Sequence, residues 1–324
     1  MNGATARSNQ LPTRTTFRPP VPNRPIPTPV KHPRYPWHVN SKEKTHMTIA
    51  AGFVTEDGVV LCTDSQYSGG IKRNGKKIFP MQLNGSAVAF ALAGNEAFAK
   101  RAIEECFACL DMRENSDRQH SIGGIKDVLE AALKDFHERF VFTRPSEERE
   151  TVRFSLLVAV ASLKEKPVVF CSHETVLIPI DGHECLGAGY FVGHHIIEIG
   201  YRSKMSLDDA VALAIHVVTM AKEYVDGVGG PTQILWIKDG IVSPFHPLNA
   251  AVYTEPLILN HERESAELLF HAANPRLSDE EFQGYAGRFA ATVGLIRKHW
   301  RQSFENQDLL QMLMRSGERK KESE

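Results

Sequence analysis

Short apolar runs mark the start of the patterned part of the chain. Residues 48–54 (TIAAGFV) and 58–63 (GVVLCT) are rich in β-branched and small apolar residues, which is typical of strands. The TEDG sequence that joins them contains an Asp-Gly pair, a strong signal for a hairpin turn. If the turn centres on Glu56, then Thr48 and Asp64 lie opposite each other across the two strands.

The rest of the chain alternates between blocks of strand pattern and blocks of helix pattern. Strand-like apolar runs occupy residues 86–94, 154–163, 167–172 and 183–187, and a further hairpin is predicted around the Asp-Gly pair of residues 232–245. Apolar residues at helical spacing occupy 96–110, 125–142, 206–221 and 278–300, and a shorter helix runs through His194 and His195. Strands and pairs of helices in alternating blocks fit an α+β fold, a four-layer αββα sandwich, better than repeated β-α units.

Composition divides the chain into three parts. Residues 1–46 hold nine of the 18 prolines and eight Lys or Arg against one acidic residue, so the remaining chain carries about −8 of a total formal charge of −1. Proline removes helix hydrogen bonds and favours extended chain, so we expect a disordered leader. Residues 48–246 form the predicted sandwich domain. Residues 247–324 form a helical extension, in which Ser278 and Glu281 make a capping box.

Several classes of protein are disfavoured by the composition. The total formal charge of −1 gives no whole-chain sign of nucleic-acid binding. No apolar stretch approaches the length of a membrane span, and the start of the chain lacks the apolar core of a secretory signal. The leader is basic like a mitochondrial presequence, but its prolines disfavour the amphipathic helix that such a presequence needs. Five scattered cysteines are unlike a disulfide framework, so we expect reduced thiols and a cytoplasmic protein.

A series of short motifs resembles the proteasome β-subunits and the bacterial proteasome-like peptidases, which are N-terminal-nucleophile hydrolases. The motifs occur in order: TIAAGFVTEDGVVLCTDS from Thr48, KKIF from Lys76, ALAG ending at Gly94, then LGAG and DGVGG. Together they span about residues 48–245. The family fold is the αββα sandwich, which the strand and helix pattern predicts independently.

The resemblance also implies roles for individual residues. It makes Thr48 the nucleophile and Asp64 the acidic residue beside it, with Lys77 as the catalytic lysine. It makes Gly94 the glycine of the oxyanion hole. Asp226 matches a family residue that lies near the nucleophile. In the substrate site, Ser68 would pair with the substrate backbone, while Leu92 and Glu96 would border the side-chain pocket.

These residue types suit an amide-bond hydrolase that needs no cofactor and no metal. An N-terminal threonine carries its own base, an α-amine with a pKa of about 7.7–8. A lysine ammonium at Lys77 would lower the proton affinity of the amine and the hydroxyl, and Asp64 would hold that lysine. Gly94 precedes a helix that starts near Asn95, where the helix dipole favours a developing oxyanion. We therefore expect a threonine-type peptidase.

Further expectations about partners come from the resemblance alone. It implies homo-oligomeric rings, peptide or unfolded-protein substrates, and an ATP-dependent unfolding partner. Neither nucleic acid nor a membrane is expected as a partner.

The chain departs from the family pattern at three places. Ala188 stands where family members usually have a serine that assists the amine, and Val228 or Gly229 replaces a second serine. Met47 precedes Thr48, whereas self-cleaving members have glycine there. Our hypothesis is that translation from Met47, followed by ordinary removal of the initiator methionine, exposes Thr48.

Two alternatives to an active hydrolase remain open at this stage. One is a catalytically inactive, proteasome-like structural subunit. The other is a nucleotide-binding protein, because Gly187, Gly189 and Gly193 imitate a dinucleotide loop and Asp208 follows about twenty residues later.

Simpler interpretations apply to three other features. Lys76 is the alternative to Lys77 as the catalytic lysine. His194 and His195 lie about 100° apart on a helix, which suits surface or packing roles better than one metal ion. The C-x-x-C of Cys106 and Cys109 is interpreted as helix packing.

Overall fold

Two five-stranded antiparallel sheets form the centre of the molecule. The computed structural model describes residues 48–68, 72–114, 121–245 and 254–321. One sheet has the order β10 (His183–Leu186), β1 (Ala50–Val54), β2 (Val59–Thr63), β11 (Gln233–Lys238), β12 (Ile241–Phe245). The other has the order β5 (Ile78–Leu83), β6 (Ser86–Gly94), β7 (Phe154–Ser162), β8 (Val168–His173), β9 (Val176–Pro179). A short separate pair is formed by β3 (Gln66–Tyr67) and β4 (Arg73–Asn74).

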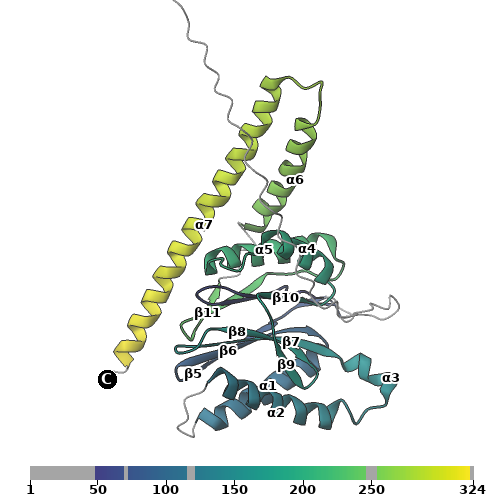
Figure 1. Cartoon of the computed structure of the whole chain (residues 1–324), viewed down its shortest axis with the longest axis vertical. Helices are drawn as coiled ribbons and strands as arrows, with labels where there is room; N and C mark the ends of the chain where they lie inside the picture. The colour runs from purple at the N-terminus through teal and green to yellow at the C-terminus, as the bar shows by residue number, and fades with distance from the viewer. Residues whose placement is uncertain (1–47, 69–71, 115–120, 246–253, 322–324) are drawn as a thin grey trace, which may run out of the picture. The chain divides into compact units, whose positions relative to one another are not determined.

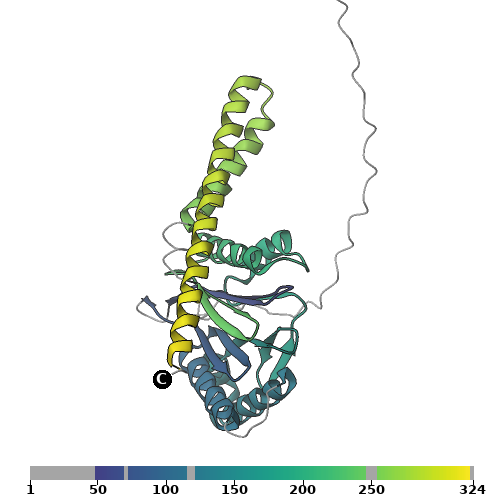
Figure 2. The same ribbon diagram turned by 90° about the vertical axis from the view of Figure 1, so that its left-hand side faces the viewer.

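Helices cover the outer face of each sheet (Figures 1 and 2). Helices α4 (Tyr190–Gly200) and α5 (Leu207–Tyr224) pack on the sheet that contains β1, and helices α1 (Glu96–Glu114) and α2 (Ile122–Phe140) pack on the sheet that contains β6. The short α3 (Ser146–Arg149) and the 3₁₀ turn η1 (Glu150–Val152) lead into β7. This is the predicted αββα sandwich.

The β6 sequence explains how three of these layers meet. Its alanines, at positions 87, 89, 91 and 93, face the opposite sheet, while Val88, Phe90 and Leu92 face α1 and α2. Side chains alternate between the two faces of a strand, so small residues on one face let the sheets approach and large residues on the other fill the space under the helices. A strand buried on both faces reads as an unbroken apolar run, which is why SAVAFALAG was recognisable in the sequence.

The first hairpin has a different register from the predicted one. Ala50 pairs with Thr63 and Val54 with Val59, so the four residues of the loop centre the turn between Glu56 and Asp57. Thr48 is therefore not directly opposite Asp64, as a turn centred on Glu56 required. Instead the Asp64 backbone N–H donates to the carbonyl of Ile49 (3.3 Å). The second predicted hairpin, β11–β12, turns at Asp239 and Gly240, which both have positive φ, as the favoured two-residue turn requires.

Side-chain caps fix the starts of α1, α2 and α5. Asn95 Oδ1 accepts from the backbone N–H groups of Ala97 and Phe98, which caps α1. The Ser121 hydroxyl caps α2 and the Ser206 hydroxyl caps α5. The helix predicted over 206–221 is therefore present as α5, which continues to Tyr224.

Two helices, α6 (Glu255–Ala272) and α7 (Asp279–Lys321), follow the sandwich and lie side by side (Figures 1 and 2). The predicted capping box starts α7, with Ser278 Oγ donating to Glu281 Oε2 (2.8 Å) and accepting from the Glu281 backbone N–H (3.3 Å). Helix α6 is joined to α5 by an ion pair between Lys222 Nζ and Glu255 Oε1 (2.8 Å). The predicted leader and the first residues of the predicted extension, 247–253, lie outside the described residues.

None of the described helices has the length and apolar character needed to cross a membrane.

The aromatic core under α2 gives a stability prediction. Phe136 is 1% exposed and contacts the rings of Phe98 and Phe154. Phe136→Ala should lower the free energy of unfolding by about 3–5 kcal/mol, because a large buried side chain leaves a cavity. Phe191→Ala, at a phenylalanine that is 70% exposed, should change it by less than about 0.5 kcal/mol. Denaturant unfolding measures both values, and equal losses would contradict this account of the core.

Candidate active site

Thr48, Asp64 and Lys77 come together in the interior, at the ends of three strands. Thr48 stands just before β1, Asp64 just after β2 and Lys77 just before β5. The Thr48 hydroxyl donates to Asp64 Oδ1 (2.7 Å) and accepts from Lys77 Nζ (2.6 Å), while Lys77 Nζ also donates to Asp64 Oδ1 (2.8 Å). Thr48 is 3% exposed, Asp64 0% and Lys77 1%. The structure thus gathers three of the residues named from sequence into one buried polar cluster.

The Asp64 carboxylate is fully hydrogen-bonded. Oδ1 accepts from the Ile49 backbone N–H (3.1 Å) in addition to Thr48 and Lys77. Oδ2 accepts from the backbone N–H groups of Gln66 (3.1 Å) and Gly229 (3.1 Å). A buried charge is tolerated only when it is paired and hydrogen-bonded, and these five donors meet that condition.

The Lys77 ammonium is equally well enclosed. Its third hydrogen bond goes to the carbonyl of Gln66 (2.6 Å), and it lies 4.9 Å from the centre of the Tyr67 ring. Burial lowers the pKa of Lys77 below its usual value, while the Asp64 carboxylate opposes this shift. Lys76 is exposed, with its ammonium over the Phe79 ring at 5.3 Å. Of the two lysines, Lys77 is therefore the one that reaches Thr48.

The glycine-rich loop after β10 seats the backbone of Thr48. The Gly189 N–H donates to the Thr48 carbonyl (3.1 Å). Gly187 has φ of +92°, and a Cβ there would stand 2.3 Å from the Thr48 oxygen. A Cβ on Gly193 would stand 2.8 Å from Cys185 Sγ. Close packing around Thr48 and Ile49 thus accounts for the glycines that imitate a dinucleotide loop.

Gly94 occupies a position that only glycine suits well. Its φ is +95°, and a Cβ would lie 2.7 Å from the carbonyl oxygen of Arg153. The next residue, Asn95, caps α1, so Gly94 stands at the N-terminal end of that helix. The positive end of the helix dipole lies here, so a negatively charged group beside Gly94 would be stabilised.

The other residues named from sequence are placed differently. Leu92 is 1% exposed and packs in the core between its sheet and α1 and α2. Glu96 pairs with Arg73 and with Lys100 (2.6 Å to Oε1). Ser68 follows β3 at the edge of the undescribed residues 69–71. Asp226 is exposed in the turn after α5, and its side chain has no hydrogen bond or ion pair with any described residue.

Two glutamines and a backbone amide complete the cluster and were missed from sequence. Gln66 contributes both its backbone N–H and its carbonyl, and its side chain donates to the Gly227 carbonyl (3.0 Å). Gln233 Oε1 accepts from the Lys77 backbone N–H (2.9 Å). Gly229 donates its backbone N–H to Asp64. Most of these contacts involve backbone atoms, which every residue type has, so the sequence does not reveal them.

Comparison with curated proteins finds proteasome β-subunits. No family model matches the chain. The chain is 25% identical over 214 residues to proteasome subunit beta 2 of Pyrobaculum islandicum, a match that covers 64% of this chain and 100% of that protein. It is 27% identical over 208 residues to proteasome subunit beta 2 of Thermofilum pendens, covering 61% of this chain and 92% of that protein.

Comparison with solved structures finds Anbu proteins. An Anbu (Gly-1) mutant from Hyphomicrobium sp. strain MC1 superposes with a TM-score of 0.59 at 17% identity, covering 70% of this chain and 99% of that one. The helical assembly of the Anbu complex from Pseudomonas aeruginosa gives 0.57 at 15% identity, covering 72% and 99%. Anbu from Yersinia bercovieri, described as an ancestral beta-subunit, gives 0.54 at 15% identity, covering 71% and 100%. The chain is therefore similar in sequence to proteasome β-subunits and similar in fold to Anbu, which confirms the resemblance and the sandwich predicted from its motifs.

Proposed function

We propose that this chain is a threonine-type peptidase whose nucleophile is the Thr48 hydroxyl, acting once Thr48 is the first residue. The observation that carries this proposal is the buried cluster in which Lys77 Nζ lies 2.6 Å from Thr48 Oγ1. An ammonium at that distance stabilises the alkoxide that develops as the hydroxyl loses its proton. The similarity to proteasome β-subunits supports the same class of reaction.

The base in this mechanism is the α-amine of Thr48. While Met47 is attached, the Thr48 nitrogen is an amide and cannot take up the proton. Removal of Met47 after translation from that residue gives an amine with a pKa of about 7.7–8, suited to proton transfer near neutral pH. Asp64 holds Lys77 in place, and the backbone N–H of Gly94 receives the oxyanion of the tetrahedral intermediate. The resemblance alone assigns Asp226 to the surroundings of the amine.

The substrate side is assigned from the resemblance to the proteasome β-subunits. We place the substrate backbone along Ser68 and Gly94, with its side chain directed toward Glu96. The resemblance assigns Leu92 to the border of that pocket, although in this structure the Leu92 side chain is packed in the core. Arg73 and Lys100 balance the charge of Glu96, so the pocket entrance need not favour basic substrates.

Assembly is part of the proposed function. One structural neighbour is described as a helical assembly of the Anbu complex, and we propose that this chain forms homo-oligomeric rings. Unfolded polypeptide is the proposed substrate and an ATP-dependent unfoldase the proposed partner. We place the protein in the cytoplasm because its five scattered cysteines are unlike the disulfide framework of a secreted protein.

Two observations favour an inactive structural subunit as the second candidate. The Thr48 hydroxyl donates a hydrogen bond to Asp64 Oδ1. A base can take up the hydroxyl proton only by breaking this hydrogen bond. Ala188 also supplies no hydroxyl to orient the amine. These features predict a slower enzyme if the amine is free and no enzyme if it is not.

The state of the N-terminus separates the two candidates. Intact-mass measurement and N-terminal sequencing of native protein should find a chain that begins at Thr48. Detection only of longer chains, in which the Thr48 nitrogen is an amide, would support the structural subunit instead.

Substitution of the nucleophile gives the test of the reaction. A chain expressed from Met47 should hydrolyse fluorogenic peptides. Thr48→Ala should lower kcat by at least ~10³-fold, because alanine has no hydroxyl to attack the peptide bond. Thr143→Ala, at an exposed threonine on the surface, is the control and should keep full activity. Equal hydrolysis by Thr48→Ala and the parent chain would show that Thr48 is not the nucleophile.

The two neighbouring lysines form a matched pair for stability and activity. Lys77→Ala leaves Asp64 buried without its partner, so the free energy of unfolding should fall by about 3–5 kcal/mol, and kcat should fall by ~10²-fold or more. Lys76→Ala removes an exposed ammonium and should cost no more than about 1 kcal/mol, with activity unchanged. Denaturant unfolding and peptide hydrolysis measure the two effects. Similar behaviour of the two variants would refute the assigned role of Lys77.

A further inference from the structure

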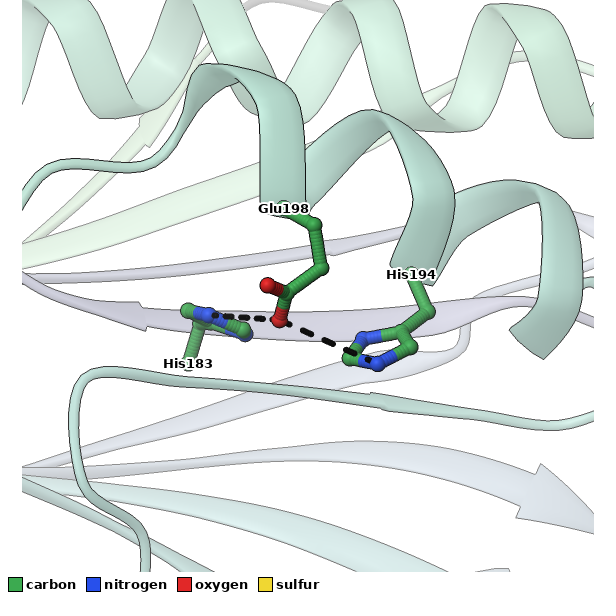
Figure 3. A group of neighbouring side chains, drawn as sticks. All are labelled: His183, His194 and Glu198. Atoms are coloured by element: carbon green, nitrogen blue, oxygen red, sulfur yellow. Dashed lines mark ion pairs between the residues drawn. The ribbon is translucent and has the colours of Figure 1, made fainter. Parts of the chain in front are cut away.

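A second polar cluster lies at the outer edge of the sheet that contains β1. His183 stands on β10, the outermost strand of its sheet, and His194 and Glu198 stand one turn apart on α4. Glu198 Oε1 lies 3.8 Å from His183 Nε2 and 3.8 Å from His194 Nε2. All three ligand atoms lie within 4.8 Å of one another. Figure 3 shows the three side chains pointing toward a common centre.

These separations suit a bound ion better than direct bonds among the side chains. A distance of 3.8 Å is too long for a hydrogen bond. Two ligands at about 2.1 Å from a tetrahedral metal ion stand about 3.4 Å apart. To hold one ion, each Glu198–histidine distance would shorten by about 0.4 Å, and the two histidine nitrogens, which lie within 4.8 Å of each other, would approach to the same separation.

One ligand of the cluster, His183, is fixed by its surroundings, while the other two, His194 and Glu198, are more exposed. The His183 side chain is 13% exposed, and its ring packs edge-on against Tyr201 at 4.6 Å between centres. The Tyr201 hydroxyl donates to the Val54 carbonyl (3.0 Å), which fixes that ring to the sheet. The side chains of His194 and Glu198 are 41% and 51% exposed, so they can rotate onto an ion without disturbing the core.

We propose that His183, His194 and Glu198 bind a divalent transition-metal ion of the zinc type, with water in the remaining coordination position. Two imidazole nitrogens and one carboxylate oxygen are ligands that zinc accepts. Magnesium and calcium prefer all-oxygen sites, so they are not suited to this donor set. The His194–Glu198 spacing of four residues places both ligands on one helix face, a signal that sequence reasoning on His194 and His195 overlooked.

The ion would have a structural role, because the cluster is remote from Thr48 along the sheet. His183 pairs with Phe53, five residues from Thr48, which corresponds to about 16 Å of strand. An ion there joins α4 to the edge strand β10. Helix α4 begins just after Gly189, whose N–H holds the Thr48 carbonyl, so the ion also stabilises the element that seats the proposed nucleophile.

Metal binding by the untagged full-length chain tests this proposal. After treatment with a chelator, equilibrium dialysis against Zn²⁺ with elemental analysis should find one ion held by these residues. His194→Ala and Glu198→Gln should each weaken that binding by ~10²-fold or more, since each removes a ligand. His195→Ala is the matched control: it removes a histidine from the same helix about 100° away from the cluster and should leave binding unchanged.

Thermal unfolding provides a second readout that does not depend on activity. Zn²⁺ should raise the Tm of the parent chain and of His195→Ala, because the ion binds the folded state, and should raise it much less for His194→Ala and Glu198→Gln. Without metal the variants should share the parent Tm, since the two ligands are largely exposed. Replacement by Mg²⁺ should give no rise. Zinc binding and Tm shifts that are equal in all four chains, or absent from the parent, would overturn the proposal.

Discussion

The ion pair between Lys77 and Asp64 is the interaction on which the site and the sandwich both depend. Both charges are out of contact with water, and removing two charges from water costs several kcal/mol per ion before compensation. Asp64 follows a strand of one sheet and Lys77 precedes a strand of the other. The pair therefore forms only when the two sheets are packed together, which couples assembly of the fold to assembly of the cluster.

The arrangement around this pair supports the proposed role of Thr48. Its hydroxyl is placed between an ammonium and a carboxylate, and its carbonyl is held by Gly189. A threonine that only filled space in the core would need neither the two charged partners nor the hydrogen bond to its carbonyl. The missing element is the base, because the peptide bond to Met47 occupies the nitrogen that would supply it. The proposed enzyme thus differs from the proposed structural subunit by one covalent bond, while the geometry of the side chains is shared.

Local signals predicted most of the fold, and contacts between distant segments account for what was missed. The runs in β6 and β7, the Asp-Gly turn before β12 and the capping box of Ser278 and Glu281 are fixed by residues close in sequence. The predicted register of the first hairpin was wrong by one residue, because the loop holds four residues and is not centred on Glu56. Asp57 in that loop accepts a hydrogen bond from the backbone N–H of Leu207 in α5, which is a contact between distant segments. For the site, the motifs that resemble the proteasome β-subunits pointed to Thr48, Asp64 and Lys77. The roles of Gln66 and Gly229 could not be predicted, since their backbone atoms make the contacts.

Covalent labelling of Thr48 tests the central claim most directly. A peptide epoxyketone can react with both the hydroxyl and the free amine of an N-terminal threonine, so it reports the two groups that the mechanism requires. Peptide mapping of a chain that begins at Thr48 should find the adduct on that residue. It should form much more slowly in Lys77→Ala, because the ammonium no longer favours the alkoxide. A chain with a free Thr48 amine that gives no adduct, or labels at the same rate without Lys77, would contradict the account.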